Sequence, residues 1–139
     1  MREATVSDGA IRVEISSDQD IVGARQKGRT LATELGFSTA EATLIATAIS
    51  ELARNIVSYA RRGEIALQRI QNTTREGIMV VASDEGPGIR DLRQAMRDGF
   101  STSGSLGLGL PGVRRLMDEF EIASGVGCGT KVTVKKWRP

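Results

Sequence analysis

Residues 38–59 read STAEATLIATAISELARNIVSY and carry the strongest structural signal in the chain. Ser38 and Glu41 form the S-x-x-E pattern of a helix N-terminus, in which each of the two side chains accepts a hydrogen bond from the other residue's backbone amide. Apolar side chains then recur at helical intervals at Leu44, Ile45, Ala48, Ile49, Leu52 and Ile56. The stretch therefore predicts a long helix that ends near Tyr59 and buries one face.

Two polar side chains of this helix, Glu51 and Asn55, are four residues apart and so project from one face. An amide oxygen can bind Mg²⁺, which prefers oxygen ligands and keeps several waters, while a neighbouring carboxylate can polarise a hydroxyl group or a water. The alternative is a solvated polar stripe, which is common on amphipathic helices. The pair alone leaves both interpretations open.

Shorter patterns on both sides of this helix predict a sheet. Alternating apolar and polar residues indicate strands over 10–16, 64–70, 77–83, 120–125 and 130–137. Helical spacing indicates further helices over 20–35, 91–97 and 111–120, the first ended by Gly36 and the last begun by Pro111. The predicted fold class is α/β (α+β), a two-layer sandwich with helices on one face of a mixed, mainly antiparallel sheet. We expect residues 1–139 to form one domain.

Composition excludes several kinds of chemistry. Histidine is absent, which removes the commonest metal ligand and the commonest general base at neutral pH, and the single cysteine, Cys128, cannot form an internal disulfide. No apolar run approaches the roughly 20 residues that span a bilayer, and no signal-peptide pattern opens the chain. The net charge of +2 is small and its basic residues are scattered. We therefore expect a cytoplasmic protein with no nucleic-acid or membrane partner.

The sequence DEGPGI begins with Asp84, directly after the apolar strand 77–83. A carboxylate at the end of a strand can accept a hydrogen bond from an exocyclic amine such as that of adenine. Gly86 and Gly88 would let the backbone approach a flat ring without an intervening side chain. The alternative is a plain turn rich in Asp, Gly and Pro.

A second glycine-rich stretch, GLGLPG at 107–112, matches the spacing of a dinucleotide-binding loop. That loop should follow a strand directly and have an acidic residue about 20 positions later, whereas here a Ser/Gly stretch precedes it and lysines follow at that distance. The Walker pattern also fails, because no lysine follows the glycines. What remains is a loop ahead of a helix N-terminus, where backbone amides can bind an anion.

Taken together and in this order, these motifs resemble the ATPase fold shared by gyrase, MutL and histidine kinases. The resemblance covers most of the chain, and it rests on Glu51 with Asn55, Asp84-x-Gly86-x-Gly88, Gly107-x-Gly109, and a late Gly129-Thr130. Within that fold, ISELARNI, DEGPGI, DGFSTSGSLGLGLPGVRRLMDEF and the closing KW are similar to the switch serine/threonine kinases of bacterial stressosomes.

The resemblance implies a role for each matching residue. Glu51 would be the general base, and Asn55 would bind Mg²⁺ beside the bound ATP. Asp84 would bind adenine above the turn of Gly86 and Gly88, and Thr130 would assist it. The phosphate contacts would come from Gly107, Leu108, Gly109 and Leu110.

The resemblance also implies an activity and partners. It implies an ATP- and Mg²⁺-dependent kinase that phosphorylates serine or threonine of STAS-domain proteins in a stressosome-like complex. The kinase would then engage a downstream effector, in such circuits a serine phosphatase. One alternative in the same family is an anti-sigma-like protein that sequesters a transcription factor. A histidine-kinase catalytic domain is disfavoured, since the chain has no histidine to accept phosphate.

One feature departs from the pattern of many relatives, which place a basic side chain near the γ-phosphate. Residues 98–113 contain no lysine or arginine. Arg54, Arg114 and Arg115 are the candidates nearest to the predicted site, with a solvated surface charge as the alternative for each. The serines and threonine of 101–105 fit a lid better than a nucleophile, because no basic side chain in that stretch could activate them.

Overall fold

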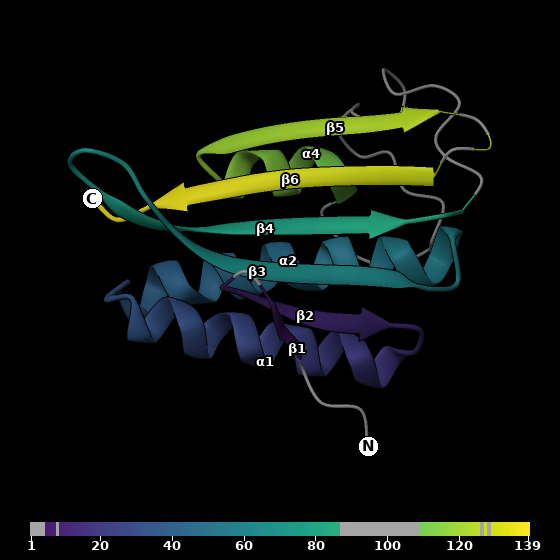
Figure 1. The fold of residues 1–139 in the computed structure, drawn as a ribbon, viewed down its shortest axis with the longest axis horizontal. Coiled ribbons are helices and arrows are strands. Elements are labelled where there is room, and N and C mark those ends of the chain that lie inside the picture. The colour runs from purple at the N-terminus through teal and green to yellow at the C-terminus, as the bar shows by residue number, and fades with distance from the viewer. Residues whose placement is uncertain (1–4, 8, 87–108, 126, 128) are drawn as a thin grey trace.

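Residues 5–7, 9–86, 109–125, 127 and 129–139 are described by a computed structural model, in which one antiparallel sheet carries helices on one face (Figure 1). The strands are β1 (Thr5–Ser7), β2 (Ala10–Ile15), β3 (Gly63–Gln71), β4 (Glu76–Asp84), β5 (Glu119–Gly125) and β6 (Gly129–Trp137). The helices are α1 (Asp18–Glu34), α2 (Thr39–Tyr59) and α4 (Gly109–Leu116). The strand order is β1-β2-β3-β4-β6-β5, and every one of these pairings is antiparallel. The predicted two-layer fold class is confirmed.

Helix α2 lies behind the middle of the sheet and begins as its sequence predicts (Figure 1). The Ser38 hydroxyl accepts a hydrogen bond of 3.1 Å from Glu41 N, and Ser38 N donates to Glu41 Oε1 at 3.4 Å. The apolar stripe of Ile45, Ala48, Ile49, Leu52 and Ile56 is buried. Leu44 is 38% exposed, contrary to the periodicity, because it lies at the margin of the stripe that faces the strands.

The core between the two layers is aliphatic. Its largest fully buried side chains come from the strands and from two of the helices: Ile15, Ile45, Ile49, Leu52, Ile65, Leu67, Ile78, Val80, Val113 and Val134. Burying each of these side chains stabilises the fold by roughly 1.5–3 kcal/mol before the entropic cost of ordering it. This packing fixes α2 and α4 against the same sheet.

Helix α1 is capped at its start by Asp20, whose carboxylate accepts hydrogen bonds from Ser16 N at 2.8 Å and Ser17 N at 3.1 Å. Partial burial alone would raise the pKa of Asp20, but the hydrogen bonds from the backbone and side chains of Ser16 and Ser17 outweigh it, and the pKa is lowered. Gly36, at φ +92°, follows the end of α1 as predicted.

The end of the last helix differs most from the sequence prediction, while the other bounds of the predicted and described elements lie within two residues of it. The helix expected over 111–120 is α4, which ends at Leu116, and Glu119 and Phe120 belong to β5. The chain leaves the helix there because Asp118 N donates to Lys135 O and the Asp118 carboxylate accepts from Trp137 N at 2.7 Å. Strand β1 was not predicted, and the helix expected over 91–97 lies outside the described residues. None of the described helices is long and apolar enough to cross a membrane.

Candidate active site

The carboxylate of Glu51 lies where α2 meets α4. Glu51 is 6% exposed, and a buried carboxylate is costly unless polar or charged groups satisfy it. Its Oε1 is 3.3 Å from Nη1 of Arg54, one turn along α2, and its Oε2 accepts a hydrogen bond of 3.3 Å from Gly109 N. Gly109 begins α4, so the carboxylate faces the positive end of that helix. Two predicted site residues, 58 positions apart, are thus in contact.

Asn55 lies one turn after Glu51 on α2 and is half-buried. Within the described ranges, no three His, Cys, Asp or Glu side chains gather in a way that could hold a metal. Protein-bound Mg²⁺ commonly uses one or two side-chain oxygens and completes its shell with waters and substrate phosphates. The amide oxygen of Asn55 beside the Glu51 carboxylate fits that mode, in which the ion arrives with a nucleotide.

Asp84 ends β4, on the face of the sheet that the helices cover. The strand register places Gly63 of β3 on one side of it and Thr130 of β6 on the other, with Ser124 of β5 beyond Thr130. Directly opposed residues share a face, so these residues form one row across four strands. Asp84 Oδ1 accepts a hydrogen bond of 2.9 Å from Gly86 N, which fixes the carboxylate at the strand end.

Three glycines approach Asp84 so closely that a side chain would not fit. A Cβ at Gly63 would collide with the backbone oxygen of Ser83, and one at Gly129, where φ is +80°, would collide with the backbone oxygen of Asp84. A Cβ at Gly86 would come within 2.8 Å of Cα of Ala60, just past the end of α2. The C-terminal ends of α2 and β4 and the start of β6 therefore converge at Asp84. Figure 1 shows the arrowhead of β4 at the same end of the sheet as the start of β6.

The remaining predicted residues divide into two groups. Leu110 is 7% exposed and packs in the core, so its side chain cannot contact a phosphate and only its backbone is available. Thr130 is half-buried, and its Oγ1 lies 2.8 Å from Oγ of Ser124. Gly88, Gly107 and Leu108 lie outside the described residues. Ser124 was missed by the sequence analysis, although its alternation with Ile122 in β5 already places the two on one face.

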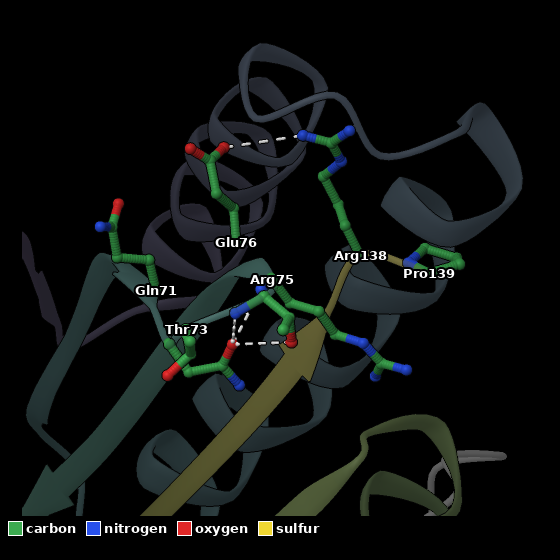
Figure 2. A pocket seen from close by; sticks show the side chains of 8 residues that line it. Gln71, Thr73, Arg75, Glu76, Arg138 and Pro139 are labelled. Atoms are coloured by element: carbon green, nitrogen blue, oxygen red, sulfur yellow. Dashed lines mark hydrogen bonds and ion pairs between the residues drawn. The ribbon is translucent and has the colours of Figure 1, made fainter.

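A separate polar pocket of about 300 Å³ lies at the opposite end of β4 (Figure 2). The β3–β4 turn and the chain end line it: Gln71, Asn72, Thr73, Thr74, Arg75, Glu76, Arg138 and Pro139. Asn72 Oδ1 accepts hydrogen bonds from Thr74 N and Arg75 N, and Arg138 pairs with Glu76 at 3.6 Å. These contacts stabilise the turn, and none of the predicted site residues lines the pocket.

Comparison with known proteins gives the class of protein to which this fold belongs. The chain belongs to the Histidine kinase-like ATPase domain family, whose match covers residues 8–136. Membership of this family implies use of ATP. The chain is 54% identical over 125 residues to the Serine/threonine-protein kinase RsbT of Bacillus subtilis (strain 168), with 90% of this chain and 94% of that protein covered. The family and its switch-kinase branch, both predicted from the motifs, are confirmed.

Other comparisons agree with this placement. The chain is 31% identical over 127 residues to the Anti-sigma F factor of Caldanaerobacter subterraneus subsp. tengcongensis, with 88% of this chain and 89% of that protein covered. Among solved structures, the mycobacterial sensor histidine kinase MprB matches with a TM-score of 0.54 at 15% identity, covering 91% and 97% of the two chains. The SiaB-SiaC complex from Pseudomonas aeruginosa matches with a TM-score of 0.58 at 14% identity, covering 93% and 89%. At these identities the two structures support the fold alone.

Proposed function

We propose that this chain is an ATP- and Mg²⁺-dependent serine/threonine-protein kinase that phosphorylates STAS-domain partners of a stressosome-like complex. The observation that carries the proposal is the contact of Glu51 with Gly109 N, which sets a buried carboxylate against a helix end suited to phosphate. The identity to RsbT over nearly the whole chain supports a protein hydroxyl group as the acceptor.

In this proposal the nucleotide lies with its base at Asp84. Asp84 Oδ1 is engaged by Gly86 N, so Oδ2 accepts from the exocyclic amine of adenine. Gly86 and Gly88 would lie beneath the ring, and Thr130, the neighbour of Asp84 in the strand register, would assist the carboxylate.

The phosphates lie at the start of α4, where Gly109 and Leu110 offer backbone amides, and Gly107 and Leu108, which precede the helix in the sequence, would supply further contacts. Asn55 would hold Mg²⁺, which neutralises charge on the phosphates. Glu51 accepts the proton of an incoming serine or threonine hydroxyl as its oxygen attacks the γ-phosphorus. The bond from that phosphorus to the bridging oxygen of ADP breaks, and ADP leaves with the electron pair.

Glu51 must change partners during this sequence. A carboxylate and a phosphate oxygen cannot both accept the single proton of Gly109 N at full strength, and two anions in a poorly solvated site repel each other. Binding of ATP would therefore move Glu51 off Gly109 N, with Arg54 still beside it to balance its charge. The freed carboxylate then faces the acceptor hydroxyl.

The wider proposal concerns partners and location. The chain acts in the cytoplasm as a single kinase domain over residues 1–139, binds neither nucleic acid nor membrane, and regulates a stress-signalling pathway by partner switching. Phosphorylation of the STAS partners releases the kinase to a downstream effector, for which we propose a serine phosphatase.

A second candidate function is supported by the anti-sigma relatives at about 31% identity, namely sequestration of a transcription factor. One experiment separates the two. The chain and its Glu51→Ala variant are incubated with labelled ATP, Mg²⁺ and STAS-domain proteins, and a sigma factor is offered in a parallel binding assay. Label on serine or threonine of a STAS protein, lost in the variant, supports the kinase. Tight binding of a sigma factor without transfer of label supports sequestration.

A further inference from the structure

Ser124 lies at the end of the row that begins with Gly63 and Asp84, and its hydroxyl contacts the neighbouring strand twice. Ser124 Oγ donates a hydrogen bond of 3.1 Å to the backbone oxygen of Gly129. The same oxygen lies 2.8 Å from Oγ1 of Thr130, at a distance where either hydroxyl could donate. The direction of this second bond decides what Thr130 can offer to a ligand.

The donation from Ser124 to Gly129 O indicates that direction. A serine hydroxyl has one proton, and here Gly129 O takes it. With that proton on Gly129 O, Ser124 accepts from Thr130, and the hydroxyl proton of Thr130 points toward Ser124. The Thr130 oxygen is then left with lone pairs alone, beside a carboxylate that is itself an acceptor.

We infer that Ser124 is a positioning residue that makes Thr130 a hydrogen-bond acceptor and so selects a purine with an exocyclic amine at position 6. The inference rests on the proposed function, because it assumes that the base binds at Asp84. An adenine amine has two protons, one for Asp84 Oδ2 and one for Thr130, directly or through a water. A 6-oxo purine has an acceptor oxygen in place of that amine, and its one proton on this edge, at N1, can pair with only one of the two acceptors. The other acceptor is left unpaired, which is costly in a half-buried site.

The test compares calorimetric affinities for ATP and inosine triphosphate, which differ in the 6-amino and 6-oxo groups and in the proton that the 6-oxo base carries at N1. In Ser124→Ala the Thr130 hydroxyl is free to rotate and donate to a 6-oxo group. The preference for ATP should therefore fall by about threefold to tenfold, the range for one neutral hydrogen bond. Ser124→Thr keeps a hydroxyl at the same position and should restore most of the preference.

Ser83→Ala is the matched control, since it removes a serine hydroxyl one residue from Asp84 but on the opposite face of the sheet. Its preference should equal that of the unaltered chain. An unchanged ratio of the affinities for ATP and inosine triphosphate in Ser124→Ala overturns the inference. Equal losses of the two affinities, which a merely structural role would give, leave that ratio unchanged and so overturn it too. Failure of the unaltered chain to bind ATP would instead refute the proposed site, and the inference with it.

Discussion

Replacing Glu51 by glutamine should separate nucleotide binding from phosphoryl transfer. The substitution removes one negative charge from a side chain that is 6% exposed and keeps its shape and an acceptor oxygen for Gly109 N. If a phosphate must displace Glu51 from that amide, the neutral side chain competes less well. We therefore expect Glu51→Gln to bind ATP more tightly while transferring phosphate more slowly.

The magnitudes follow from the contacts of the carboxylate. Two unit charges about 4 Å apart repel each other by about 4 kcal/mol at an effective dielectric constant of 20. Arg54 at 3.3 Å and the bound Mg²⁺ would offset most of this, and Glu51 can turn aside. If about 1 kcal/mol of the repulsion remains, its removal in Glu51→Gln corresponds to roughly fivefold tighter ATP binding. Loss of the general base should slow transfer by about 10²-fold to 10⁴-fold.

Calorimetry with ATP, ADP and AMP tests the predicted gain in affinity. Transfer of label from ATP to a STAS protein tests the predicted loss of phosphoryl transfer. The gain should be seen with ATP and ADP but not with AMP, which lacks the β- and γ-phosphates. The control is Glu121→Gln, which removes the same charge from an exposed side chain on the face of β5 opposite to Ile122 and Ser124. It should leave the affinities for ATP, ADP and AMP unchanged. Equal gains for AMP and ATP, or transfer at the normal rate in Glu51→Gln, would refute the reasoning.

Three further predictions concern the Asp84 row and the helix cap. Asp84→Asn should weaken ATP binding by about tenfold to a hundredfold, the range for a charge-assisted hydrogen bond, and unchanged affinity by calorimetry would contradict the assignment. Gly129→Ala should destabilise the fold by about 1–3 kcal/mol in thermal melts, because its Cβ would collide with the backbone of Asp84. Gly127→Ala should cost less, because Gly127 has the same φ of +80° but no described atom within 4 Å of its added Cβ. Equal losses of stability in the two variants would contradict the contact with Asp84. Because the pKa of Asp20 is lowered, its stabilising effect is complete above the unfolded value near 3.9 and is lost as pH falls through the folded value. The melting temperature of Asp20→Asn should therefore converge with that of the unaltered chain at low pH, and a constant difference would exclude this titration.

Most of the fold could be predicted because its local signals agree with its packing. The capping box of Ser38 and Glu41 and the stripe from Ile45 to Ile56 specify α2 without reference to any other segment. The C-terminal end of α4 could not be predicted, because its helical pattern continues through 117–120 and only the pairing of Asp118 with Lys135 and Trp137 ends it. Strand β1 has three residues, too few for an alternating pattern to be recognised.

The site was predictable in its residue types and less so in its contacts. Glu51, Asn55 and Asp84 stand out by spacing and by their place at the ends of periodic segments. The pairing of Thr130 with both Asp84 and Ser124 depends on the register of three strands, of which two are separated by more than 40 residues along the chain. Local patterns place Ser124 on the same face as Ile122 but contain no such register, so its pairing with Thr130 could be recognised only from the folded structure.

The contacts of α2 explain why one helix carries so much of the predicted chemistry. Glu51 meets Gly109 near the middle of the helix, while Ile56 and Ala60 approach Gly63 and Gly86 beside Asp84. From Glu51 to Ala60 is nine residues, or about 13.5 Å at the helical rise of 1.5 Å per residue. The distance between the proposed transfer site and the proposed base site is thus set by a rigid, core-packed element and not by a loop. A substitution that shifts α2 along its axis should therefore disturb both ends of a bound nucleotide together, whereas side-chain changes at Asp84, Thr130 or Ser124 should act at the base end.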